Sequence, residues 1–235
     1  MSTEVSIAQE YIYRGRVVNL RLDEVRLANG TTARREVVEH RDAVAIVPMD
    51  GAGRVLLVRQ FRTPVGKELL ELPAGVMKDG ETPAEAALRE LAEETGLTSG
   101  NLTWLSSFYT SPGFSNELLH VYAASDLSPR RGTPDDDEDI ALVWLNVADA
   151  LAMIAAKNHK NGVANPFAQM RKDFGYDFCR AESEKNPFVA GPLKRTDCSL
   201  VSDGAAALVL TDSETAKTMG KAINFRATAH AQDFL

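Results

Sequence analysis

The sequence predicts an α/β (α+β) fold in which helices pack on a mixed β-sheet. Strand-like runs occupy residues 11–62, one strongly marked helix follows at about 82–95, and strand-like runs return before an amphipathic helix at 147–158. Strands that precede and follow a helix are typical of a layered sandwich around one hydrophobic core.

The composition excludes several classes of protein. The 235 residues are 44% hydrophobic and 25% charged, which is enough apolar surface to bury an ordinary core. A formal net charge of −7 disfavours nucleic acid or an anionic membrane as a partner, because phosphates would be repelled. Two cysteines, Cys179 and Cys198, suit a reducing compartment, and no stretch reads as a leader or a membrane span. We therefore expect a cytoplasmic protein.

The strand-like runs alternate apolar and polar residues or are rich in β-branched side chains. Asp50-Gly51 is a strong hairpin signal between two of them. In chain order the runs are 11–22, 24–27, 35–40, 43–49, 54–62, 102–109, 117–124 and 140–146.

The helix at about 82–95 has clear start and stop signals. Thr82 is a suitable N-cap, Pro83 takes the first helical position, and Glu85 completes a capping box. Gly96 supplies the left-handed residue that ends the helix.

The chain divides unevenly. We expect an N-terminal β-strand element at 1–45, a main domain at 46–156 and a C-terminal segment at 157–235. The helix at 147–158 should cover the sheet with Leu151, Met153 and Ile154 in the core, and a long, polar, loop-like tract should follow it.

Three glutamates predict a metal site on the first helix. Glu90, Glu93 and Glu94 fall within a third of a turn of one another. Carboxylates alone, without His or Cys nearby, suit Mg²⁺ or Mn²⁺ and not zinc. An acidic helix face exposed to water is the alternative for three glutamates considered alone.

A longer pattern surrounds the glutamates. It reads G-x5-E-x7-R-E-U-x-E-E-x-G-U, where U is a bulky aliphatic residue, and it is matched at Gly75, Glu81, Arg89, Glu90, Leu91, Glu93, Glu94, Gly96 and Leu97. The chain therefore resembles the Nudix hydrolases, which cleave nucleoside diphosphates linked to another moiety. The resemblance implies an α/β/α sandwich with a mixed sheet.

The same resemblance assigns roles to residues. Glu90 and Glu94 would be the main metal ligands, Glu93 would share the cluster and the catalysis, and the carbonyl of Ala74 would add a ligand. Arg89 would join the catalytic group by orienting the glutamates through ion pairs. Glu81 would support the loop and helix.

The flanking segments resemble those of ADP-ribose pyrophosphatases. "VRQFR" at 58–62 and "ELPAG" at 71–75 precede the pattern, and Pro112 stands fifteen residues after Leu97. The resemblance implies that Arg62 holds a phosphate, with Arg59 beside it, and that Glu71 lies near the substrate. Residues 111–113 read equally as a simple turn. The expected reaction is ADP-ribose to AMP and ribose 5-phosphate, and another nucleotide sugar is the alternative substrate.

A general base is still required, because water is a poor nucleophile until it is activated. In related enzymes a glutamate on a mobile loop before a strand takes this role, and Glu138 occupies such a place ahead of 140–146. The alternative is an acidic surface loop, which is the interpretation we adopt for Asp135 to Asp137.

The adenine should be held by stacking. The candidate aromatic residues are Tyr11, Tyr13, Phe61 and Phe114, and a core or interface role is equally open for each. The N-terminal strands resemble the element that ADP-ribose pyrophosphatases exchange between protomers, which implies a homodimer.

The C-terminal segment resembles an internal piece of a lipid-transfer-type thiolase. The similarity covers about 155–235 and rests on "AAKNHKNGVANPFAQ" and "PLKRTDCSLVSDGAAALVLTDSETAKTMGKA". The thiolase nucleophile and its His and second Cys fall outside this piece, so thiolase chemistry is excluded. A fusion of two genes is the simplest explanation. An interaction protein, in which this segment docks to a partner, is the alternative to an enzyme.

Overall fold

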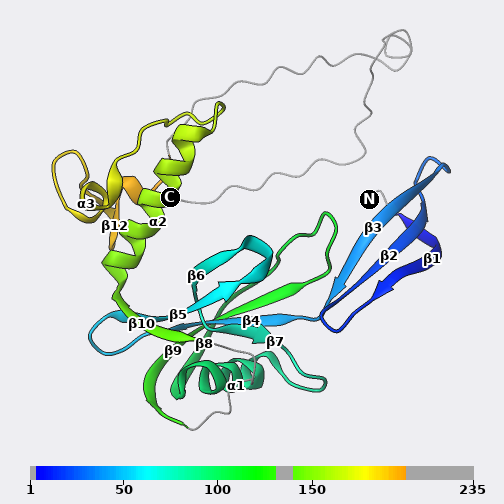
Figure 1. Ribbon diagram of the computed structural model, residues 1–235, viewed down its shortest axis with the longest axis horizontal. Helices are drawn as coiled ribbons and strands as arrows, with labels where there is room; N and C mark the ends of the chain where they lie inside the picture. Colours follow the sequence, from blue (N-terminus) through cyan, green and yellow to red (C-terminus); the bar gives the residue numbers. More distant parts are fainter. Residues whose placement is uncertain (1–3, 131–139, 200–235) are drawn as a thin grey trace.

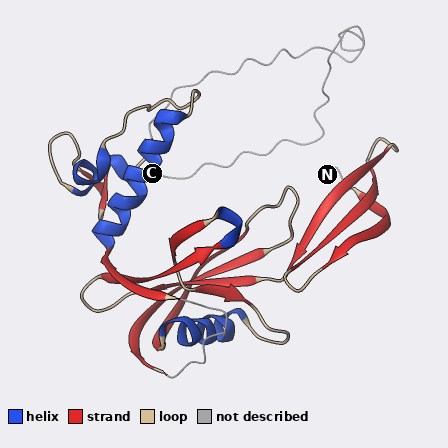
Figure 2. Cartoon of the chain, viewed as in Figure 1, coloured by secondary structure: helices blue, strands red, loops and turns tan. Residues whose placement is uncertain are grey.

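The computed structural model describes residues 4–130 and 140–199, and its strands form four sheets. Figure 1 shows a central body of strands, an N-terminal sheet at one end and a helical C-terminal segment at the other. Figure 2 separates the strand-rich body from that segment by colour.

The N-terminal sheet is an antiparallel meander of β1 (Val5–Arg14), β2 (Val18–Arg26) and β3 (Thr32–His40). The strand-like run 11–22 therefore contains the end of β1 and the start of β2. The chain reverses direction between them at Gly15, whose N–H donates to the Val18 carbonyl at 3.0 Å. β3 also bonds to the loop after β8, since the Val38 N–H donates to the Phe114 carbonyl at 2.7 Å.

The mixed sheet has the order β7-β4-β9-β8. β4 (Ala43–Pro48) pairs parallel with β9 (Leu118–Pro129) and antiparallel with β7 (Ala74–Val76), and β8 (Leu97–Tyr109) pairs antiparallel with β9. This confirms the prediction of a mixed sheet in an α/β fold.

A second antiparallel sheet has the order β10-β5-β6. It contains β5 (Arg54–Arg62), β6 (Lys67–Glu71) after the 3-10 turn η1 (Thr63–Val65), and β10 (Ala141–Asn146). The hairpin predicted at Asp50-Gly51 forms only at its base, where Met49 and Val55 make an isolated bridge. Beyond that bridge β4 and β5 enter different sheets.

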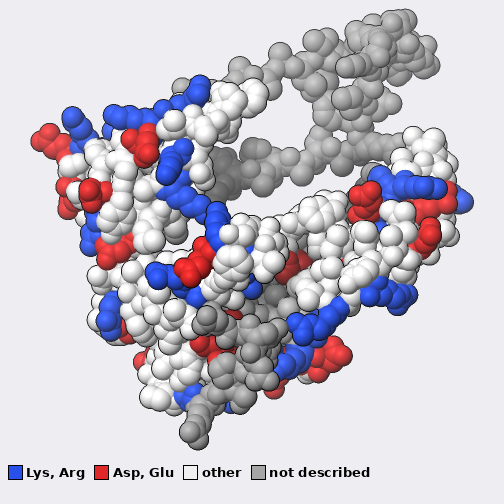
Figure 3. Space-filling view, in the orientation of Figure 1, with Lys and Arg blue, Asp and Glu red and all other residues white. Residues whose placement is uncertain are grey.

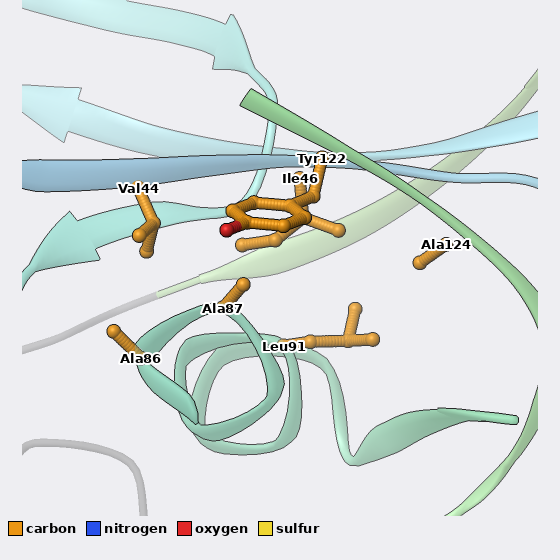
Figure 4. Close-up of a cluster of buried hydrophobic side chains, with 7 residues drawn as sticks. All are labelled: Val44, Ile46, Ala86, Ala87, Leu91, Tyr122 and Ala124. Carbon is orange, nitrogen blue, oxygen red and sulfur yellow. The ribbon is translucent and has the colours of Figure 1, made fainter. Parts of the chain in front are cut away.

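Helix α1 (Pro83–Thr95) covers one face of the mixed sheet. Thr82 Oγ1 accepts from the Glu85 N–H, the reciprocal half of the capping box is present, and Gly96 is left-handed at φ 69°, so both predicted ends are observed. Figure 4 shows the core beneath this helix. Its buried members are Val44, Ile46, Ala86, Ala87, Leu91, Tyr122 and Ala124.

Helix α2 (Val147–Ala164) leaves the end of β10 and points away from the sheets in Figure 1. The prediction that it covers the sheet is wrong, because Met153 and Ile154 are 42% and 58% exposed. Its buried residues, Ala152 and Ala155, pack instead on Cys179 of α3 (Gly175–Arg180). α2 thus does not form the second helical layer of the expected α/β/α sandwich.

The expectation of a long loop after residue 157 is also wrong in part. α2 continues to Ala164, α3 follows, and β11 (Phe188–Ala190) and β12 (Leu193–Lys194) form a small hairpin before the 3-10 turn η2 (Arg195–Asp197). Buried Asn186 explains this local order, since its amide donates to the carbonyls of three residues at 3.0–3.3 Å, namely Phe178, Cys179 and Ala181.

Candidate active site

The capped helix α1 places the predicted metal ligands against the strand β7. Glu90 and Glu94 are buried, and the Glu90 side chain is 12% exposed, against 23% for the Glu93 side chain. Burial of a carboxylate is costly, so buried carboxylates gathered on one helix face indicate a candidate functional site.

The backbone of β7 makes room for these carboxylates. A Cβ added at Gly75 would lie 2.2 Å from Glu90 Cδ, so any other residue here would force the Glu90 carboxylate to move. The neighbouring Ala74 N–H donates to Glu94 Oε2 at 3.1 Å. Two successive β7 residues therefore position two of the helix carboxylates.

Arg89 connects the glutamates. Its Nη1 donates to Glu90 Oε1 at 2.6 Å and to Glu93 Oε2 at 2.7 Å, and its Nε donates to Glu81 Oε1 at 2.6 Å. Its Nη2 donates to the Val76 carbonyl at 3.1 Å. This geometry fits the predicted orienting role, because one guanidinium ties the helix to the loop that precedes it.

The charges of this network are unevenly compensated. Hydrogen bonds from Arg89 lower the pKa of Glu81 to about 2, and the same contacts, Glu81 first, raise the pKa of Arg89. Burial nevertheless raises the pKa of Glu90, because desolvation outweighs the attraction of Arg89.

The chemistry of the donor set fits a hard divalent cation. Glu90, Glu93 and Glu94 offer oxygen alone, and a cation beside Glu90 would compensate its buried charge. Within residues 4–130 and 140–199, no three His, Cys, Asp or Glu side chains already converge on one point. Arg89 engages Glu90 and Glu93, and Ala74 engages Glu94.

A cavity of about 670 Å³ opens beside these carboxylates. Ala74 and Arg89 line it, and so does Arg62 from the end of β5. Arg62 Nη2 donates to Glu71 Oε2 at 2.8 Å, so the two predicted substrate residues are joined by an ion pair across adjacent strands. The cavity is thus lined by carboxylates of α1 and by basic residues, among them Arg62 and Arg89.

Other predicted residues lie away from this cavity in the single chain. Arg59 is exposed on β5, and Pro112 and Phe114 are exposed on the loop that joins β8 to β9. The other aromatic candidates, Tyr11, Tyr13 and Phe61, are exposed as well. Glu138, the predicted base, lies outside the described residues. All of these assignments stay predictions.

The structure adds lining residues that sequence reasoning missed. They are Arg16 in the turn between β1 and β2, His40 at the end of β3, Arg41 after it, Lys78, and Glu117 before β9. His40 Nδ1 lies 3.4 Å from Glu117 Oε1. The one available signal was their position at strand ends, where loops gather functional side chains.

The described residues contain no helix that is long and apolar enough to cross a membrane.

Comparison with known protein families identifies the class of enzyme to which this fold and site belong. The NUDIX domain model matches residues 39–166, and a model described as the nucleoside diphosphate sugar hydrolase N-terminal domain matches residues 7–38. The chain therefore belongs to the Nudix family and is a Nudix pyrophosphohydrolase, as the sequence pattern predicts.

Curated relatives agree with this family. An ADP-ribose pyrophosphatase of Bacillus subtilis is 38% identical over 174 residues, which cover 72% of this chain and 94% of the relative. A protein named methanol dehydrogenase activator, from Bacillus methanolicus, is 40% identical over the same length and with the same coverage. A solved structure titled as an ADP compounds hydrolase has a TM-score of 0.61 at 24% identity and covers 67% of this chain and 86% of its own, which supports the fold.

The Nudix match ends at residue 166, beyond the expected domain end at 156. The domain boundaries and the thiolase resemblance of the C-terminal segment stay predictions.

Proposed function

We propose that the protein hydrolyses the pyrophosphate bond of ADP-ribose to give AMP and ribose 5-phosphate, with Mg²⁺ or Mn²⁺ as the cofactor. The observation that carries the proposal is the cavity that unites Glu90, Glu93 and Glu94 with Arg62. The name of the Bacillus subtilis relative supports the choice of substrate.

Each residue of the site has a separate role in the proposed reaction. Arg62, held by Glu71, binds a phosphate oxygen of the substrate through its guanidinium. Arg89 keeps the carboxylates oriented. Glu90 and Glu94, with Glu93 and the Ala74 carbonyl, would hold the cation. When bound, the cation lowers the pKa of water and neutralises charge on the pyrophosphate. Glu138 takes the proton from the attacking water.

We also propose a homodimer. The β1 strand exposes several large apolar side chains, which a monomer would leave in water. They are Val5, Ile7, Tyr11, Ile12 and Tyr13.

The test of the reaction is to separate products by chromatography after incubation with ADP-ribose, with Mg²⁺, with Mn²⁺ and with excess chelator. AMP and ribose 5-phosphate should form only with the cation. Equal turnover in chelator would refute metal dependence. Faster hydrolysis of coenzyme A or a nucleoside triphosphate would refute the substrate, and faster hydrolysis of GDP-mannose would favour another nucleotide sugar.

A matched pair of variants tests the site. Arg62→Ala should weaken binding of ADP-ribose, seen as a raised KM, because it removes a charged phosphate ligand. Arg59→Ala is the matched variant, because Arg59 lies on the same strand but does not line the cavity of its own chain. If Arg59→Ala alone raises KM, the phosphate ligand is misassigned.

A second candidate function is activation of a partner enzyme. The name of the Bacillus methanolicus relative favours it. A dehydrogenase assay with and without this protein, using wild type and Glu94→Gln, tests it. Activation that survives in Glu94→Gln would show that the partner effect does not need hydrolysis.

A further inference from the structure

The N-terminal sheet meets the rest of the protein beside the active-site cavity. Figure 3 shows this sheet as a lobe at the right, with charged side chains of both signs on its surface. Its three strands share no sheet with the other described strands, yet His40, at the end of β3, lines the cavity. Only residues 41–42 link β3 to β4, so the orientation of His40 depends on local contacts.

The loop between β8 and β9 supplies these contacts. The Val38 N–H donates to the Phe114 carbonyl at 2.7 Å, and the Asn116 N–H donates to the Val38 carbonyl at 3.4 Å. Val38 and Ser115 thus form a parallel bridge. If this pairing continued, the His40 N–H would donate to the backbone carbonyl of Asn116. It donates instead to Asn116 Oδ1 at 2.9 Å, so this side chain replaces the backbone carbonyl and ends the pairing.

Glu117 comes directly after Asn116 and lines the cavity together with His40. Its Oε2 accepts from the Thr110 hydroxyl at 2.6 Å, and its Oε1 lies 3.4 Å from His40 Nδ1. His40 Nδ1 also lies 2.6 Å from the Arg41 carbonyl. His40 and Glu117 therefore form a pair at the cavity wall, and Asn116 holds the backbone of the first and precedes the second.

These contacts cross the boundary between the two family models that match the chain. The N-terminal model ends at residue 38 and the NUDIX model begins at residue 39, so Val38 and His40 lie on either side. Both are bonded to the same loop. Asn116 itself does not line the cavity, so an effect of this residue on the substrate must pass through His40 and Glu117.

We propose that Asn116 is a positioning residue of the active site, which fixes His40 and Glu117 at the cavity wall where the substrate binds. The inference rests on the proposed function, since it requires ADP-ribose to occupy this cavity. Asn116 is exposed, so water satisfies the His40 N–H when the amide is removed, but water does not fix its direction. The loss should therefore appear in substrate binding and hardly at all in stability.

The first test is steady-state kinetics with ADP-ribose and Mg²⁺. Asn116→Ala should raise KM about three- to ten-fold, which is the effect of one hydrogen bond, and change kcat less than about two-fold. The value of kcat should hold because Glu90 and Glu94 are positioned by Arg89 and by β7. Asn116→Asp keeps an acceptor oxygen and should return KM to within about two-fold of wild type.

Asn101→Ala is the matched control. Asn101 is an exposed asparagine on β8 whose Nδ2 donates to Ser125 Oγ at 3.1 Å, and it does not line the cavity. This variant should keep the wild-type KM. Equal KM in Asn116→Ala and wild type, or an equal rise in both alanine variants, would overturn the proposal. An Asn116→Asp variant that binds ADP-ribose as weakly as Asn116→Ala would overturn it as well.

A second measurement does not depend on the reaction. Hydrogen exchange of the His40 amide, followed by NMR in protein labelled selectively at histidine, reports the bond to Asn116 directly. Exchange should be about five-fold faster or more in Asn116→Ala and unchanged in Asn101→Ala. If wild type does not hydrolyse ADP-ribose, the proposed function fails, and the exchange rate still decides whether Asn116 positions His40. An unchanged rate in Asn116→Ala would show that it does not.

Discussion

Helices α1 and α2 differ in how firmly the rest of the protein positions them. α1 has a full capping box, a left-handed glycine at its end and a face buried against the mixed sheet. α2 starts at Asn146 without a side-chain cap and buries only Ala152 and Ala155. A helix that holds several carboxylates in a site must be fixed by several independent contacts. α2 carries no such cluster and links the sheets to the C-terminal segment.

The largest effect should come from a charge on α1. Glu94→Gln removes a carboxylate from the cation site, and we expect the rate of ADP-ribose hydrolysis to fall by roughly 10²–10⁴-fold. Binding of Mn²⁺, followed by electron paramagnetic resonance, should weaken in parallel. A matching loss of rate in Glu81→Gln would show that the roles assigned along the helix are wrong.

A smaller effect should come from the strand beneath the helix. Gly75→Ala places a Cβ against the Glu90 carboxylate and forces it to move, so we expect a loss of about 100-fold in kcat/KM. Gly51→Ala is the control, since a Cβ there meets no atom within 4 Å. Equal activity of the two variants would mean that Glu90 tolerates displacement.

Two core substitutions compare the helices directly. Ala87 on α1 and Ala152 on α2 are both fully buried, so Ala87→Leu and Ala152→Leu should each cost about 1–3 kcal/mol of local stability. Chemical denaturation monitors the stability, and turnover per folded molecule monitors the site. Turnover should fall in Ala87→Leu only. A fall in Ala152→Leu would show that the C-terminal segment supports the active site.

Among the charged residues of the site, Glu81→Gln should have the smallest effect on rate, and we expect it to lower turnover about ten-fold or less. It breaks the ion pair with Arg89 and should cost about 2 kcal/mol of stability at neutral pH. Because the folded pKa of Glu81 is lowered from 4.5 to about 2, this stability is present above pH 4.5 and is lost as the pH falls towards 2. The difference in thermal unfolding between variant and wild type should shrink over that range. A difference that is independent of pH would contradict this origin.

Much of the fold was predictable because its signals are local. The helix α1 and the strands β3, β4, β5, β8, β9 and β10 follow from patterns within a few residues of each element. The short strands β6 and β7 were not predicted. The features that were predicted wrongly depend on residues far away in the sequence. Met153 and Ile154 look like core residues because they are large and apolar. The face of α2 that is actually buried is the one that packs on Cys179, which comes 24 residues after Ala155 (179 − 155).

The sequence alone determined the bounds of α1, the register of Glu90, Glu93 and Glu94, the family and its class of chemistry. These properties depend on helix geometry and on a fixed spacing of residues, both of which are readable along the chain. Tertiary structure alone decided which other residues meet at the site. Arg16 and Glu117 are about a hundred positions apart, yet both line the cavity beside α1. The bonds from Arg89 to Val76 and Glu81, and the space that Gly75 leaves for Glu90, exist only because β7 packs against that helix.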